Sequence, residues 1–253
     1  MPEKPRILGV IPARLASTRL PRKVLREIAG EPMLAWVYRA ARACSQLDEV
    51  LIATDSDEVM EFAHARSFPA IFTPAECASG SDRVHAVAQS IPADIYVNIQ
   101  GDEPLLRPQH LETLLQPMSR PEVEVATIST PCTSEQVHNP NAVKVVTAAN
   151  GRALYFSRST IPFDRDHFGT VAHHKHLGIY AYRKTALDRF PTLPYRTLEQ
   201  AEKLEQLRFL ENGIDIYVTS TPFDTIGVDT EEDLRAAEKF LLHQSLHQRA
   251  PVS

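Results

Sequence analysis

Cysteine is scarce in this sequence of 253 residues. Cys44, Cys77 and Cys132 are the only three, and they are far apart and odd in number. No CxxC pair occurs, so a disulfide framework is not expected, and reduced thiols of an intracellular protein are the simpler interpretation.

Long apolar runs and an excess of positive charge are also missing. The first residues, Met1 to Arg6, lead into only a short apolar segment, which is too short for a signal peptide core or a membrane span. The formal net charge is -5, which argues against sequence-independent binding to nucleic acid. These absences predict a soluble, cytoplasmic protein.

Three common catalytic or nucleotide-binding motifs do not occur. There is no GxGxxG after the first apolar segment, no GxxxxGK[ST] phosphate loop, and no GxSxG nucleophile elbow. Acyl transfer is therefore a poor fit. Any phosphate site must depend on side-chain cations as well as on backbone N–H groups.

The order of apolar and polar segments predicts an α/β protein. Strand, loop and helix alternate in the first half, which indicates βαβ units and a Rossmann-like open, mostly parallel sheet. From residue 123 strands dominate, and we interpret residues 132–213 as an inserted, smaller β-rich lobe, with 1–131 and 214–253 forming the core. The expected strands are 6–11, 49–54, 69–73, 94–99, 123–130, 143–148, 154–157, 176–182 and 214–219. The later expected helices include 198–211 and a last helix that Thr230 caps. In the last helix an apolar stripe is formed by Leu234, Ala237, Leu241 and Leu242.

A basic loop follows the first expected strand. It carries five cations within 13 residues, together with the hydroxyl groups of Ser17 and Thr18. Arg offers a planar fork to phosphate oxygens and Lys a compact charge, so this loop is a candidate polyphosphate site. A solvated basic loop is the alternative. The cations are Arg14, Arg19, Arg22, Lys23 and Arg26.

Other polar residues are expected at the carboxyl ends of the parallel strands, where ligands of open α/β sheets bind. They are Thr54, the turn from Gly80 to Arg83, Gln100 and Asp102. Asp102 is the most informative, because Mg²⁺ prefers one or two carboxylates with substrate oxygens and water. A turn aspartate that bonds its own backbone is the alternative.

The local sequence favours ordinary roles for Asp229 and for the histidines near residue 175. Asp229 precedes Thr230 and three acidic residues, all of which favour a helix N-terminus, so an ordinary helix-start acid is the favoured interpretation. His174 and His176 lie on one face of a strand without a carboxylate or cysteine at useful spacing. A substrate-contacting or core histidine is therefore favoured over a zinc site.

Taken together, these segments resemble the nucleotide-sugar cytidylyltransferases, and among them the 3-deoxy-manno-octulosonate (Kdo) cytidylyltransferase family. Each matching run of residues is weak evidence by itself, but together, in order, the runs cover almost the whole chain. The runs are Ile11-Pro12-Ala13-Arg14, Arg19-Leu20-Pro21, Ala53-Thr54-Asp55, Ser79-Gly80-Ser81-Asp82-Arg83, Asn98-Ile99-Gln100-Gly101-Asp102-Glu103-Pro104, Tyr155-Phe156-Ser157-Arg158, His176-Leu177-Gly178-Ile179-Tyr180-Ala181-Tyr182, Leu204-Glu205-Gln206-Leu207-Arg208 and Val228-Asp229-Thr230.

The resemblance implies a reaction and a role for each group of residues. CTP and Kdo would give CMP-Kdo and diphosphate for lipopolysaccharide synthesis, with Mg²⁺ held by Asp102 and Asp229, in a protein that is commonly a homodimer. Two sets of substrate contacts are implied: Arg14, Ser17, Arg19 and Lys23 on the triphosphate, with Thr54, Gly80, Arg83 and Gln100 toward the nucleotide; and Arg158 on the sugar carboxylate, with His176, Tyr180, Glu205 and Gln206 on its hydroxyls.

Three alternatives to this reaction remain possible from the sequence. The stretch from Ser159 to Phe163 and the run from Lys175 to Tyr182 also resemble relatives that use 8-amino-3,8-dideoxy-manno-octulosonate. A metal-dependent glycosyltransferase would share the sheet, but it usually has a DxD pair where this chain has Gly101-Asp102-Glu103. A non-enzymatic nucleotide-sensing module would explain the basic loop but not a second carboxylate.

Overall fold

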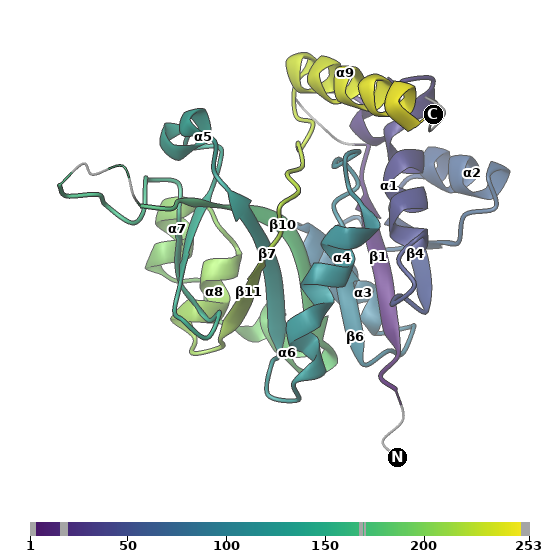
Figure 1. Ribbon diagram of the computed structural model, residues 1–253. Coiled ribbons are helices and arrows are strands. Elements are labelled where there is room, and N and C mark those ends of the chain that lie inside the picture. Colours follow the sequence, from purple (N-terminus) through teal and green to yellow (C-terminus); the bar gives the residue numbers. More distant parts are fainter. Residues whose placement is uncertain (1–3, 16–19, 167–168, 170, 249–253) are drawn as a thin grey trace. The chain divides into compact units, whose positions relative to one another are not determined.

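The computed structural model describes residues 4–15, 20–166, 169 and 171–248, with side chains of the last helix described as far as His243. The chain divides into two compact units (Figure 1), each formed from three segments. The predicted boundaries of the inserted lobe, 132–213, are not tested by this division and stay a prediction. Unit 1 is Met1–Ile7, Ala93–Val97 and Gln109–Asp224, and unit 2 is Leu8–Pro92, Asn98–Pro108 and Thr225–Ser253.

Unit 2 contains parallel strands with helices between them. β1 (Ile7–Ala13) pairs in parallel with β4 (Glu49–Thr54), which pairs in parallel with β5 (Ala70–Phe72). Nearly every side chain of β1 and β4 is buried, as expected for strands covered on both faces. The α/β prediction is confirmed. The other elements are η1 (Lys23–Leu25), β2 (Glu27–Ile28), β3 (Glu31–Pro32), α1 (Met33–Arg42), α2 (Asp57–Ala65), α3 (Gly80–Ala88) and α9 (Glu231–Gln248).

The last helix, α9, packs through a narrower stripe than the sequence predicts. Leu234 and Ala237 are buried and Leu241 packs at their edge, but Leu242 is 49% exposed. Residues 234, 237 and 241 follow the helical period, whereas 242 lies about 100° further round. This stripe belongs to a core cluster that joins the start of α9 to the loop after residue 98. Its buried members are Leu20, Ile28, Met33, Leu105, Val228, Leu234 and Ala237.

Unit 1 is rich in strands, as expected for residues after 123. β7 (Val125–Pro131) is central, with β10 (His174–Arg183) antiparallel on one side and β11 (Ile216–Ser220) parallel on the other. β8 (Lys144–Thr147) pairs antiparallel with β9 (Ala153–Ser157) and touches β10. The other elements are β6 (Ile95–Asn98), α4 (Pro108–Leu115), η2 (Gln116–Ser119), α5 (Ser134–His138), α6 (Lys184–Arg189), η3 (Phe190–Thr192), α7 (Thr197–Glu202) and α8 (Gln206–Glu211).

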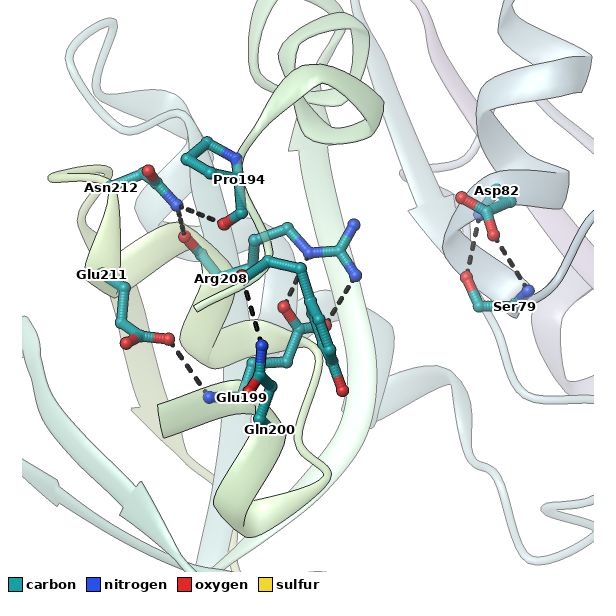
Figure 2. Close-up of polar contacts among 9 residues, drawn as sticks. Ser79, Asp82, Pro194, Glu199, Gln200, Arg208, Glu211 and Asn212 are labelled. Carbon is teal, nitrogen blue, oxygen red and sulfur yellow. Dashed lines mark hydrogen bonds and ion pairs between the residues drawn. The ribbon is translucent and has the colours of Figure 1, made fainter. Parts of the chain in front are cut away.

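The prediction of one helix over 198–211 is wrong. The structure has two short helices, because Lys203 adopts a left-handed conformation (φ 53°) that ends α7. A buried ion pair joins the two helices: the carboxylate of Glu199 accepts hydrogen bonds of 2.8 and 2.6 Å from Arg208. Figure 2 shows this pair between the helices, together with Glu211 accepting from the backbone N–H of Glu199. We call this turn at Lys203 the corner between α7 and α8; the residues that follow it begin a separate helix.

Candidate active site

Two carboxylates of unit 2 converge on one ammonium group. Nζ of Lys23 lies 2.5 Å from Oδ2 of Asp102 and 2.9 Å from Oδ1 of Asp229. Lys23 begins η1, Asp102 follows β6 by four residues, and Asp229 precedes α9. The three residues are remote in sequence, so the fold itself creates this cluster.

Backbone contacts bring the two carboxylates together. The N–H of Val228 donates to the carbonyl oxygen of Asp102 over 2.9 Å, which ties the two carboxylate-bearing segments side by side. Gly101 passes so close to β1 that a Cβ at this position would lie 2.8 Å from the carbonyl oxygen of Pro12. Only glycine fits there without a shift of the backbone, so Gly101 sets the approach of Asp102 to the end of β1.

The structure separates Asp229 from the capping of α9. The N–H of Asp233 donates to Oγ1 of Thr230, and the carboxylate of Asp233 accepts from the N–H groups of Asp229 and Thr230. Thr230 and Asp233 therefore form the reciprocal cap, as the sequence predicts for Thr230. The carboxylate of Asp229 instead contacts Lys23.

The charges of this cluster suit a divalent cation. Burial by itself would lower the pKa of Lys23, but Asp102 and Asp229 together raise it above its ordinary value. The ammonium of Lys23 thus lies between the side chains of Asp102 and Asp229, which are 27% and 47% exposed. A metal cation would occupy a similar position between the two carboxylates. Two carboxylates open to solvent leave positions for water and substrate oxygens, which is the donor set that Mg²⁺ prefers. The residues fit the predicted metal.

Arg14 and Arg83 lie on either side of Asp55. Arg83 is fully buried, donates to Oδ2 of Asp55 over 2.9 Å and also bonds the hydroxyl of Thr73. Nε of Arg14 lies 3.9 Å from the same carboxylate oxygen, and its Nη1 donates to the carbonyl oxygen of Ala78. In this structure Arg83 therefore supports the site from behind, whereas half-buried Arg14 is accessible to a ligand.

The remaining predicted nucleotide contacts differ in exposure. Thr54 is fully buried and its hydroxyl accepts from the N–H of Ser56. A Cβ on Gly80 would lie 3.7 Å from Nε2 of Gln100, which donates to Asn98, so the fold does bring Gly80 and Gln100 together. Gly80 opens α3 behind a reciprocal cap between Ser79 and Asp82 (Figure 2). Ser17 and Arg19 lie outside the described residues.

Arg158, at the end of β9 in unit 1, has an unneutralised charge. Its Nε donates to the carbonyl oxygen of Glu202 over 2.8 Å and its Nη1 to that of Pro140 over 3.2 Å. Within the described parts of the chain no carboxylate pairs with this guanidinium. Nη2 and one hydrogen of Nη1 are left for a ligand, and together they match the two oxygens of a carboxylate.

His176 and Tyr180 lie together on β10. Their rings are 5.4 Å apart, and Phe156 packs edge-on against His176 at 5.0 Å. Burial, with a smaller contribution from Lys175, lowers the pKa of His176 to about 3, so its imidazole is neutral at physiological pH. Burial also raises the pKa of Tyr180. Neutral rings of this kind can exchange hydrogen bonds with hydroxyl groups.

Glu205 and Gln206 stand at the corner created by Lys203. Glu205 is exposed and precedes α8, while Gln206 is buried as the first residue of that helix. Nε2 of Gln206 is buried and has no hydrogen-bond partner in the described structure. A buried amide without a partner is costly, so a ligand oxygen would be stabilised there.

Two charged residues around Arg158 are not marked by any sequence pattern. Lys144 is fully buried and Glu202 ends α7. Both contact Arg158. Lys144 sits in an apolar strand and Glu202 in an acidic helix, so neither pattern marks them.

Comparison with known proteins identifies the class. Residues 8–216 match the family model described as cytidylyltransferase, and the chain therefore belongs to the cytidylyltransferase family. Among its relatives, the 3-deoxy-manno-octulosonate cytidylyltransferase of Acidobacterium capsulatum is 69% identical over 94% of this chain and 97% of its own length. The protein of the same name from Koribacter versatilis is 60% identical over 92% of this chain and 89% of its own.

A solved structure agrees with this assignment. CMP:2-keto-3-deoxy-manno-octonic acid synthetase in complex with CTP superposes with a TM-score of 0.91 at 41% identity, covering 94% of this chain and 99% of that one. The fold prediction is thereby confirmed. Among the described helices, none combines the length and apolar character needed to cross a bilayer.

Proposed function

We propose that this protein transfers the cytidylyl group of CTP to 3-deoxy-manno-octulosonate, giving CMP-Kdo and diphosphate. The observation that carries the proposal is the 69% identity, over almost the whole of both chains, to a cytidylyltransferase named for this sugar. The glycosyltransferase and the nucleotide-sensing alternatives are not favoured, since neither belongs to this family.

The reaction is an in-line substitution at the α-phosphorus of CTP. The oxygen of the anomeric hydroxyl forms the new P–O bond and loses its proton, while the bond to the bridging oxygen of diphosphate breaks. Little covalent work falls to the protein, so positioning and charge neutralisation supply the rate. Basic side chains of unit 2, including Arg14, Arg19 and Lys23, are proposed to bind the triphosphate.

Asp102 and Asp229 are proposed to hold Mg²⁺. Ser17, Gly80 and Gln100 are proposed to contact the nucleotide, as the family resemblance implies, whereas the buried Thr54 and Arg83 would support that site from within the core. When bound, the metal would lower the pKa of the sugar hydroxyl and neutralise phosphate charge. Lys23 contacts Asp102 and Asp229 through its two ion pairs. We propose that its ammonium also stabilises departing diphosphate.

Unit 1 is proposed to bind the sugar. The guanidinium of Arg158, without a carboxylate partner in the described structure, would pair with the carboxylate of the substrate. His176, Tyr180, Glu205 and Gln206 would bind its hydroxyls, and the unpartnered amide of Gln206 supports this. We further propose a homodimer in the cytoplasm, as the family resemblance implies.

A substrate comparison tests the function. Purified protein with CTP and Mg²⁺ is expected to release diphosphate with Kdo, and with a higher kcat/KM than with 8-amino-3,8-dideoxy-manno-octulosonate. Kdo is favoured because the relatives quoted above are named for it. Preference for the amino sugar would transfer the proposal to that substrate, and failure to release diphosphate with either would refute it.

A further inference from the structure

Arg158 is held on both sides of its own backbone by two charged residues. Its N–H donates to Oε2 of Glu202 over 2.9 Å, and its carbonyl oxygen accepts from Nζ of Lys144 over 2.9 Å. Glu202 also accepts from the hydroxyl of Ser157 over 2.6 Å and, through its carbonyl oxygen, from Nε of Arg158. These contacts fix both the peptide and the plane of the guanidinium.

The ammonium of Lys144 is buried and, within the described residues, forms no ion pair with a carboxylate. Its three acceptors are backbone carbonyl oxygens: those of Asn139 (2.8 Å), Ala142 (2.6 Å) and Arg158. Three acceptors match the three N–H bonds of an ammonium, whereas a neutral amine would turn a lone pair toward a carbonyl oxygen. Burial lowers the pKa of Lys144, so this arrangement has a cost that a purely packing residue would not incur.

The local charges do not cancel. Lys144 and Arg158 are both cationic, and neither pairs with a carboxylate within the described structure. The carboxylate of Glu202 contacts the hydroxyls of Ser157 and Tyr155 and a backbone N–H, not the guanidinium. One positive charge is therefore in excess. A partly buried site with this excess attracts an anion more strongly than a neutral ligand.

We propose that Lys144 and Glu202 are positioning residues for the sugar carboxylate: they hold Arg158 with its outer N–H groups free, and Lys144 adds a second positive charge behind it. This inference rests on the proposed function, which places the carboxylate of Kdo on Arg158. It assigns a specificity role to a buried lysine that contacts no substrate.

Steady-state kinetics of Lys144→Met test the charge. The expected result is an increase of about tenfold in the KM for Kdo, the size of one lost charge-assisted interaction, with the KM for CTP within twofold of wild type. Inhibition by the neutral Kdo carboxamide should change by less than threefold. Lys184→Met, which removes a partly exposed lysine of the same unit that pairs with Asp188, is the control and should change none of these constants.

Glu202 provides a second test that does not depend on the folding of Lys144→Met. Glu202→Ala should raise the KM for Kdo about tenfold, because the backbone N–H of Arg158 loses the side-chain carboxylate that accepts from it. Glu202→Gln should stay within threefold, since an amide can accept from the N–H of Arg158 and donate to Ser157. An unchanged KM for Kdo in Lys144→Met and Glu202→Ala would overturn the inference, as would equal weakening of acid and carboxamide by Lys144→Met. Failure of the proposed function is distinct: the wild-type protein would then release no diphosphate with Kdo.

Discussion

At the scale of single residues, the cluster of Lys23, Asp102 and Asp229 concentrates the chemistry. Each carboxylate lies within hydrogen-bond distance of the same ammonium, at 2.5 and 2.9 Å. A carboxylate that binds a cation cannot be replaced by an amide without loss of charge. Replacing Asp102 by asparagine therefore tests the charge of this side chain separately from its size.

Asp102→Asn is expected to lower kcat by at least about 10²-fold, on the order of one lost electrostatic stabiliser. The variant should also bind Mn²⁺, used as a probe for Mg²⁺, more weakly in calorimetry. Asp57→Asn, an exposed change in the first turn of α2, is the control and should leave both quantities unchanged. Near-normal turnover and normal Mn²⁺ binding in Asp102→Asn would contradict the metal site.

At the scale of elements, the corner between α7 and α8 depends on one ion pair. The side chain of Glu199 is only 3% exposed, and Arg208 satisfies it with two hydrogen bonds. Arg208 also lies over the ring of Phe190, 4.3 Å from its centroid. This corner carries Glu205 and Gln206, so its stability bears on the sugar contacts.

Arg208→Met should lower the free energy of unfolding by about 3–5 kcal/mol, because it leaves a buried carboxylate without its partner. Denaturant unfolding measures the change. The surface pair of Arg189 and Glu124 is the matched control, and Arg189→Met should cost no more than about 1 kcal/mol. The double variant Glu199→Gln with Arg208→Met should recover part of the loss. Equal effects of the two single Arg variants would show that the buried pair adds no special stability.

At the scale of the whole molecule, stability in acid should depend on His176. Its pKa is lowered to about 3 in the folded state, and an unfolded histidine titrates near 6.5. Between these values the unfolded state binds more protons, so His176 favours unfolding increasingly as pH falls from 6.5 toward 3. Above pH 6.5 this contribution is absent.

His176→Phe should therefore lose less stability than the wild type when pH is lowered through this range. Phenylalanine can pack against Phe156 and Tyr180 but cannot take up a proton. Chemical denaturation at a series of pH values gives the two profiles, and their difference removes the contributions of other titrating groups. Parallel profiles between pH 6.5 and 3 would mean that folded His176 is not held neutral.

Much of the fold was predictable because strands and helices leave local patterns. The apolar runs that became β1 and β4 are buried along nearly their whole length, and the predicted strand 49–54 has the observed bounds. The helix over 198–211 was predicted wrongly because a non-glycine residue, Lys203, takes a positive φ that no local pattern signals. Leu242 was likewise placed on the buried stripe, but it is at the edge of that stripe, about 100° round the helix from Leu241, and is 49% exposed.

The sequence by itself determined the α/β class, the basic loop and the ordered motifs that define the family, because these depend on local periodicity and residue type. Only the tertiary structure decided which charges meet. Lys23 pairs with a carboxylate 79 positions away and another 206 positions away, and their meeting requires a glycine at residue 101 against β1. In the sequence Lys144 likewise looks like an ordinary strand residue, and only the structure shows the three carbonyl groups that surround its ammonium. Distances between remote side chains follow from how the chain packs, which no local pattern records.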